Sequence, residues 1–169
     1  MLNNEVDLVS VQEGFDLPWP LSPGIHSEKL AMETNCAVIS GNNAKGCINC
    51  DKIILPVGST LPLNSLRVAV YLAQQFRATL HLVADIQGNE ENLQSLQRTY
   101  HILRENTDLP VVCNTFTGNF QQSVLNYAKS VQPGLIIANN AYRRHHGLFH
   151  RIMSGDFAFA GRVPVVMVD

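Results

Sequence analysis

The chain has 169 residues, of which 46% are hydrophobic and 15% are charged, and its formal net charge is -2. This composition supplies a buried core and excludes a disordered chain. Lys and Arg are nowhere concentrated enough to attract a phosphate backbone, so we expect no nucleic-acid partner. The length fits one domain of roughly 100 to 150 residues with a remainder.

The N-terminal sequence lacks the basic region and long apolar run of a signal peptide, and no stretch approaches the roughly 20 apolar residues of a membrane span. We therefore expect a cytoplasmic protein with no membrane segment. The cysteines Cys36, Cys47, Cys50 and Cys113 are too sparse for a disulfide framework, and a reducing compartment would keep them as thiols.

The first 50 residues predict a strand, a rigid loop, a short helix and a second strand. Residues 5–11 and 35–40 are the two strand segments, and the loop 18–24 and the helical segment 26–34 lie between them. A polar stretch at 41–46 follows and has the composition of a linker.

From Lys52 onward, short apolar strands alternate with amphipathic helices. The predicted strands cover residues 53–57, 79–86, 111–116, 135–140 and 163–168, and the predicted helices cover residues 64–76, 93–106, 119–131 and 149–160. Near-continuous apolar strands joined by helices of about 12 residues indicate right-handed crossovers. The fold class is therefore α/β, with a parallel sheet covered on both faces.

Helical spacing predicts which side chains face the sheet. The inward positions are Leu66, Ala69, Val70, Ala73 and Phe76 in the first helix, Leu93, Leu96, Tyr100 and Leu103 in the second, and Val124, Leu125 and Ala128 in the third. Asn64 or Ser65 is expected to cap the first helix.

The order of elements in residues 1–41 mirrors that of residues 135–168, with strand, loop, helix and strand in both. This likeness favours residues 1–50 as the remnant or tail of a preceding, similar domain plus a linker, with 51–169 as one α/β domain. An unrelated N-terminal extension is the alternative.

Three segments carry a family pattern: KIILPVGST at the first strand of the domain, SLRVAVYLAQQFRATLHLV across the first helix and second strand, and HGLFHRIMSGDFAFAGRVPVVMVD at the end. Together they resemble the universal stress protein family over residues 51–169. The resemblance implies a doubly wound, five-stranded parallel sheet of order 3-2-1-4-5, of the adenine nucleotide alpha hydrolase-like type. It also implies a ligand crevice where the strand order reverses, between strands one and four.

ATP-binding members of that family have an aspartate after the first strand and a glycine-rich stretch after the fourth, where backbone N–H groups cradle phosphates. Position by position, the aspartate falls at or beside Gly58, and the first two glycines fall near Asn139 and Tyr142. The closing Gly-Ser pair appears in reversed order as Ser154-Gly155. Side chains at glycine positions obstruct close approach of phosphate to the backbone.

The resemblance implies that what remains of the crevice is lined by Val57, Gly58, Ser59, Thr60, Val83, Asn139, Asn140, Ser154, Gly155 and Asp156. The changed anchors argue against tight nucleotide binding, and ATP or AMP stays the candidate ligand. We expect no catalytic residue, because no acid or base lies at a spacing that would activate Ser59, Thr60 or Ser65, for which helix capping is the simpler explanation.

Two further groups invite a functional interpretation. Cys47 and Cys50 have the spacing of a redox or metal pair, but no second pair completes a zinc site, so an incidental pair in a linker is favoured and no metal is expected. The loop Arg143–His150 is rich in His and Arg and covers the phosphates in the resembling family. It either attracts an anion or senses pH, or is a solvated loop, which we favour.

The terminal strand 163–168 is an edge that needs covering. In the resembling family this strand often pairs across a dimer. We expect residues 36–40 to lie antiparallel to residues 164–168 and to imitate that contact, so the alternatives are a homodimer or an intrachain pairing through the C-terminal strand. A protein partner is a further expectation.

Three functions remain open. The first is a non-catalytic universal stress protein-like module for regulation or binding in the stress response, which does not bind ATP tightly. The second is an ATP-binding stress-response switch with slow or no hydrolysis. The third is the cytosolic regulatory domain of a larger transporter or tandem protein.

Overall fold

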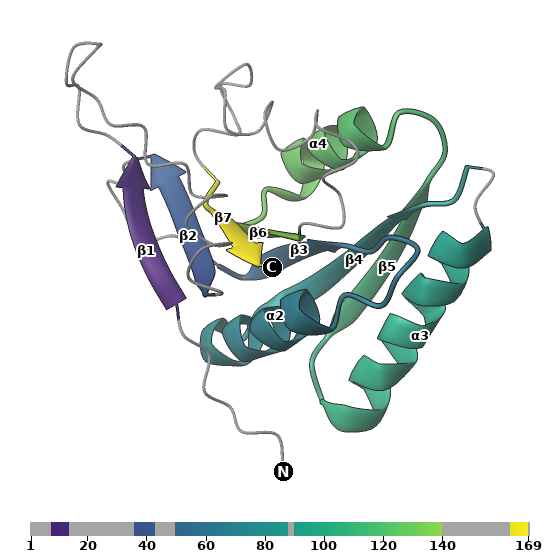
Figure 1. Ribbon diagram of the computed structural model, residues 1–169, viewed down its shortest axis with the longest axis horizontal. Coiled ribbons are helices and arrows are strands. Elements are labelled where there is room, and N and C mark those ends of the chain that lie inside the picture. Colours follow the sequence, from purple (N-terminus) through teal and green to yellow (C-terminus); the bar gives the residue numbers. More distant parts are fainter. Residues whose placement is uncertain (1–7, 14–35, 43–49, 88–89, 140–162, 169) are drawn as a thin grey trace.

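A computed structural model of the chain describes residues 8–13, 36–42, 50–87, 90–139 and 163–168. It is an α/β structure in which one seven-stranded sheet has the order β1-β2-β7-β6-β3-β4-β5 (Figure 1). The described elements are β1 (Leu8–Glu13), β2 (Ala37–Asn42), β3 (Lys52–Pro56), α2 (Leu63–Phe76), β4 (Thr79–Asp85), α3 (Glu90–Asn106), β5 (Val111–Phe116), α4 (Phe120–Val131), β6 (Leu135–Asn139) and β7 (Val165–Val168).

The five strands from β3 to β7 confirm the predicted doubly wound sheet. Taken in chain order as strands one to five, they are arranged 3-2-1-4-5, and every neighbouring pair among them is parallel. The central strand β3 is paired on both edges, and Ile53, Ile54 and Leu55 in it are fully buried. Burial on both faces explains why this strand is a continuous apolar run instead of an alternating one.

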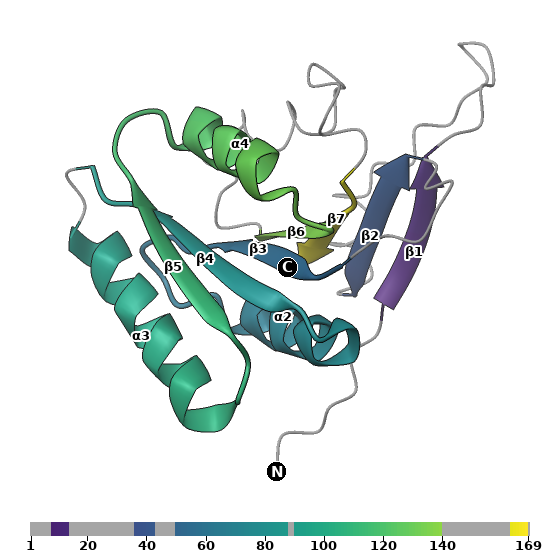
Figure 2. The same cartoon turned by 180° about the vertical axis from the view of Figure 1, so that it is seen from behind.

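Helices cover both faces of the sheet (Figure 2). On one face α2 and α3 pack on a cluster that includes Leu55, Leu80 and Leu82. On the other face α4 packs on Ile54 and Val83 through inward side chains, as predicted. Those inward side chains are Val124, Leu125 and Ala128, each at most 3% exposed. The helix predicted at residues 149–160 lies outside the described residues.

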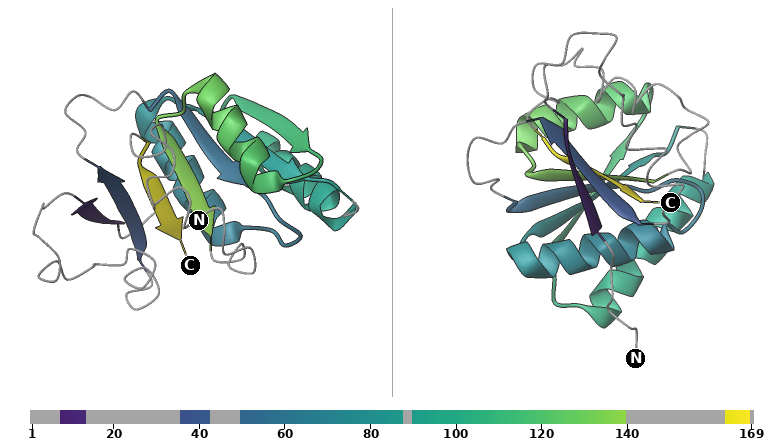
Figure 3. Two further views of the ribbon diagram at one scale, coloured as in Figure 1. Left: turned by 90° about the horizontal axis from the view of Figure 1, so that it is seen from above. Right: turned by 60° about the vertical axis from the view of Figure 1, so that its left-hand side comes forward.

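The two N-terminal strands extend the sheet beyond β7 (Figure 3). β2 is antiparallel to β7, with Val38 opposite Met167 and Ile39 opposite Val166, which confirms the predicted pairing of residues 36–40 with the C-terminal strand. β1 is parallel to β2. The sheet therefore has seven strands where the domain alone was expected to have five, and the open edge of β7 is covered within the chain.

Some sequence-based details were wrong. The N-cap of α2 is Pro62, with no side-chain cap, so neither Asn64 nor Ser65 caps the helix, and Ser65 is buried inside it. Phe76 was expected to face the sheet but is 51% exposed, because α2 ends there and the chain turns into β4 through the left-handed residue Arg77. Leu93 is 37% exposed, near the start of α3.

The burial of Val38 predicts that the N-terminal strands contribute to the stability of the whole sheet. Val38 is fully buried in the cluster beneath α4. We expect Val38→Ala to lower the free energy of unfolding by about 1 to 3 kcal/mol, through lost apolar burial and the cavity left behind. Chemical denaturation measures this change.

The control is Leu63→Ala, because Leu63 is 57% exposed at the start of α2 and its truncation should cost less than about 0.5 kcal/mol. Equal effects of the two substitutions would show that β2 does not share the core of the domain.

Candidate functional site

The strand order of the sheet reverses at β3. α2 leaves β3 on one face of the sheet, and α4 leads into β6 from the other face. β3 and β6 are adjacent and parallel, with Ile54 opposite Ile136, so the segments that follow them begin side by side at the carboxyl edge. In open α/β sheets, ligands bind at such a point.

The segment after β3 is anchored to β4 by its backbone. The N–H of Val57 donates to the carbonyl oxygen of Val83 at 2.8 Å, and both side chains are fully buried. Gly58 is half-buried, whereas Ser59 and Thr60 are exposed. The structure thus brings Val57 and Val83 together, and it places the next three predicted residues at the carboxyl edge.

The start of α2 lies beside this segment. Pro62 occupies the N-cap, the amide of Leu66 donates to the Pro62 carbonyl at 2.7 Å, and the first turn contains no acidic residue. A helix N-terminus presents N–H groups with a partial positive charge, which favours an anion. The described part of the site therefore contains one element that suits a phosphate.

The same segment lacks the acidic anchor. Residues 56–62 contain no Asp or Glu. Asp85 lies at the carboxyl end of the neighbouring strand β4, and its Oδ1 accepts the amide of Gln87 at 2.9 Å. The side chain of Asn92 donates to the Asp85 carbonyl at 2.6 Å. Asp85 therefore organises the turn into α3.

Only part of the predicted site is described. Asn139 is the last residue of β6, with its backbone opposite Val168. Asn140, Ser154, Gly155 and Asp156 lie outside the described residues, as does the loop Arg143–His150.

The cysteine prediction is tested in part. Cys47 lies outside the described residues, but Cys50 is buried, and its thiol contacts the Gly134 carbonyl at 3.9 Å. Burial, helped by the negative charge of Asp51, raises the pKa of the Cys50 thiol, which disfavours the reactive thiolate. A cysteine in a strand is commonly a small buried hydrophobe, but Cys113 is exposed on β5. Among the described ranges, no three His, Cys, Asp or Glu residues come together to hold a metal ion.

A polar cluster on the α4 face of the sheet was not predicted. His81 on β4 is 7% exposed, and its Nδ1 lies 2.7 Å from the Tyr127 hydroxyl oxygen on α4. The Asn114 side-chain amide on β5 donates to the same oxygen at 2.6 Å. Phe116 packs against the Tyr127 ring, with the ring centroids 5.7 Å apart.

These contacts accommodate the neutral form of His81. With Asn114 donating to the Tyr127 oxygen, the Tyr127 hydroxyl can donate its proton to an unprotonated Nδ1. Burial lowers the pKa of His81, the charge of Lys52 lowers it further, and Asp51 opposes both effects. Lys52 itself donates to the Val131 carbonyl at 3.0 Å at the end of α4. The cluster ties β4, β5 and α4 together around an imidazole whose neutral form is favoured by burial.

The sequence did carry one sign of this cluster. His81 lies two residues before Val83 in the same strand, so both side chains point to one face of the sheet. That is the face that α4 covers. Asn114 and Tyr127 come from other elements, and only their packing in three dimensions reveals them as partners.

Comparisons with known proteins place the fold. No protein-family model matches the chain, and no curated protein matches it by sequence. Among solved structures, a universal stress protein in complex with cAMP matches with a TM-score of 0.54 and 14% identity, over 70% of this chain and 95% of that one. A protein of the universal stress protein family from Burkholderia pseudomallei matches with a TM-score of 0.54 and 14% identity, and the match covers 73% of this chain and 98% of that one.

A universal stress protein from Archaeoglobus fulgidus DSM 4304 matches with a TM-score of 0.62 and 12% identity. That match covers 96% of this chain, which in turn spans 60% of the Archaeoglobus protein. The chain therefore has the universal stress protein fold. Among the described helices, none has both the length and the apolar character needed to cross a bilayer.

The His81 cluster predicts acid sensitivity of the fold. The lowered pKa means that below the ordinary value of 6.5 the unfolded chain binds a proton that the folded chain does not. Stability should therefore fall as pH decreases below 6.5, by at most about 1.4 kcal/mol per pH unit from this group, and level off below the pKa of the folded state. Denaturation of wild type and His81→Asn across this range measures the difference.

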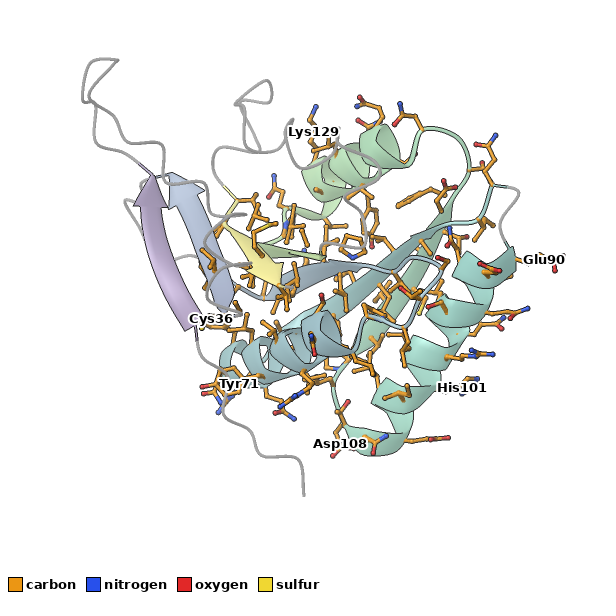
Figure 4. The ribbon with its side chains drawn as sticks, in the orientation of Figure 1. Cys36, Tyr71, Glu90, His101, Asp108 and Lys129 are labelled. Atoms are coloured by element: carbon orange, nitrogen blue, oxygen red, sulfur yellow. The ribbon has the colours of Figure 1, made fainter. Side chains whose placement is uncertain are left out.

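His101 supplies the matched control, because it points outward from α3 (Figure 4). His101→Asn should keep the pH dependence of the wild type, whereas His81→Asn should flatten it. A wild-type profile that both substitutions leave unchanged would contradict the neutral assignment of His81.

Proposed function

We propose that the chain is a member of the universal stress protein family and acts as a non-catalytic module for regulation or binding in the stress response, without tight ATP binding. The observation that carries this proposal is the uncharged segment after β3. It stands where the strand order reverses, yet residues 56–62 offer no carboxylate to a nucleotide.

The absence of a carboxylate affects the polar groups of a bound nucleotide. A nucleotide hydroxyl or amino group that loses its carboxylate partner in a buried site costs about 1 to 3 kcal/mol, equivalent to roughly five- to 150-fold in affinity. Residues 139, 142 and 154–155 also depart from the glycine pattern of ATP-binding members, which adds to the cost. The proposed module therefore uses its carboxyl edge for a protein partner or for another small ligand.

An ATP- or AMP-binding switch is the second candidate. The start of α2, where no side chain of Pro62 caps the helix and no acid lies in the first turn, favours an anion at this edge. One solved protein of the same fold is in complex with cAMP. Such a switch requires the phosphates to supply most of the binding free energy, because no aspartate follows β3 to bind the rest of the nucleotide.

We also propose that residues 1–50 are the tail of a preceding, similar domain followed by a linker. The parallel pair β1-β2 repeats the parallel pair β6-β7, and the two pairs meet at the antiparallel contact of β2 with β7. The match that covers 96% of this chain extends over a longer universal stress protein, which supports a tandem parent. The third candidate, a cytosolic appendage of a larger transporter or tandem protein, builds on this domain assignment, and cytoplasmic location is part of the proposal.

Isothermal titration with Mg-ATP, with AMP and with buffer alone tests the leading proposal. We expect no saturable heat at millimolar nucleotide. Micromolar affinity for ATP would overturn the non-binding module and promote the switch.

The missing carboxylate itself is tested by Gly58→Asp. If the uncharged segment limits binding, this substitution should tighten ATP binding by about tenfold or more, because it restores an acceptor for the ligand. Gly58→Asn is the matched control, with nearly the same shape and no charge, and should bind no better than wild type. Equal affinities of the Asp and Asn variants would place the cause of weak binding elsewhere.

A further inference from the structure

The seven-stranded sheet has β1 and β5 as its two edge strands, on opposite sides of the molecule (Figure 2). In the five-stranded domain alone β7 would be an edge, but here β2 covers it. Among the strands that the structure describes, β5 pairs only with β4. An edge strand presents a row of unpaired N–H and C=O groups that can join another strand.

The ladder with β4 fixes which backbone groups of β5 face outward. The amide of Leu80 donates to the Pro110 carbonyl, and the amide of Ile86 donates to the Phe116 carbonyl, both at 2.9 Å. Because successive residues of a strand alternate in direction, the even-numbered residues from 110 to 116 point their backbone groups at β4. The backbone groups of Val111, Cys113 and Thr115 therefore point to the open side, and no partner for them is found among the described residues.

β5 carries few of the features that normally protect an edge. Its sequence, VVCNTF, has no charged residue and no proline. Val112 is 40% exposed, and Cys113 and Thr115 are also exposed, whereas β3, β4 and β7 are almost entirely buried. Natural edges are often protected by Lys, Pro or a bulge, and the six uncharged residues of β5 leave this edge open to pairing with another strand.

We propose that two copies of this chain associate edge to edge through β5, antiparallel, about a twofold axis at Cys113. In this register Val111 of each copy lies opposite Thr115 of the other, and the two Cys113 residues face each other. All three outward-facing residues then exchange backbone hydrogen bonds, because directly opposed outward residues form the hydrogen-bonded pairs of an antiparallel ladder. The two sheets become one continuous sheet.

The pattern of β5 favours a second copy over an unrelated strand. The three outward residues are spaced symmetrically about Cys113, so a twofold axis there pairs all three with residues of β5 in the other copy. An axis at Val111 or Thr115 would pair only one of the three with β5 of the other copy. The opposed Val and Thr are both β-branched, a favourable cross-strand combination. No like charges oppose each other within the strand, since it carries none.

Removal of the central outward amide tests the interface. Cys113→Pro deletes one N–H that faces away from β4, a position where an edge strand tolerates proline. We expect sedimentation equilibrium to show a dimer for wild type and for Cys113→Ser, and dissociation at least about tenfold stronger for Cys113→Pro. Thermal unfolding of the Cys113→Pro variant checks that its monomer is folded; if it is not, Thr115→Lys serves as the second variant.

Cross-linking tests the register. Directly opposed residues of a hydrogen-bonded antiparallel pair have Cα atoms about 5.5 Å apart, which a short bifunctional thiol reagent can bridge. A variant with Cys113 as its single cysteine should therefore form a covalent dimer when it is treated with a short bismaleimide. A control with a single cysteine at His101→Cys, on the outer side of α3, should not.

A monomer at all concentrations, a dimer that survives Cys113→Pro and Thr115→Lys, or cross-linking at position 113 no faster than at position 101 would each overturn the proposal. None of these outcomes depends on nucleotide binding, so they leave the proposed function to its own test.

Discussion

The structure depends on the central position of β3. This strand is paired on both edges, with β4 and β6, and its side chains are buried by α2 on one face and α4 on the other. Each neighbouring strand must then return by a helical crossover, which places the carboxyl ends of β3 and β6 side by side. The candidate site exists because of this constraint, and its chemistry is set by whichever residues follow Pro56 and Asn139 in the chain.

Those residues carry the proposal that this chain differs from an ATP-binding protein of the same fold. The amide of Val57 is held by the Val83 carbonyl, and α2 begins next to it. The side chains that follow β3 at the carboxyl edge, Gly58, Ser59 and Thr60, offer no carboxylate. A fold is maintained by its buried apolar strands, whereas a ligand is recognised by a few exposed groups. A chain can therefore lose ligand recognition and still keep its fold.

Much of the fold could be predicted because its signals are local. The strand Val111–Phe116 and the burial of Val124, Leu125 and Ala128 follow directly from the apolar pattern, and the uncovered C-terminal strand led to the correct pairing of β2 with β7. The errors arise where an element ends or meets the edge of the sheet. Phe76 lies at the last residue of its helix, and Cys113 lies on an edge strand, and periodicity alone does not show where covering elements stop. The His81 cluster joins three segments of the chain, and the strand pattern shows only which face His81 occupies, not that Asn114 and Tyr127 are its partners.

We propose above that this chain, which has the universal stress protein fold, does not bind ATP tightly at its carboxyl edge. The most direct test is a ¹H–¹⁵N correlation spectrum titrated with Mg-ATP, which reports on the amides of Val57, Gly58, Ser59 and Thr60 individually. We expect no saturable shift of these amides at millimolar nucleotide. Saturable shifts that are centred on them at micromolar nucleotide would overturn the proposal.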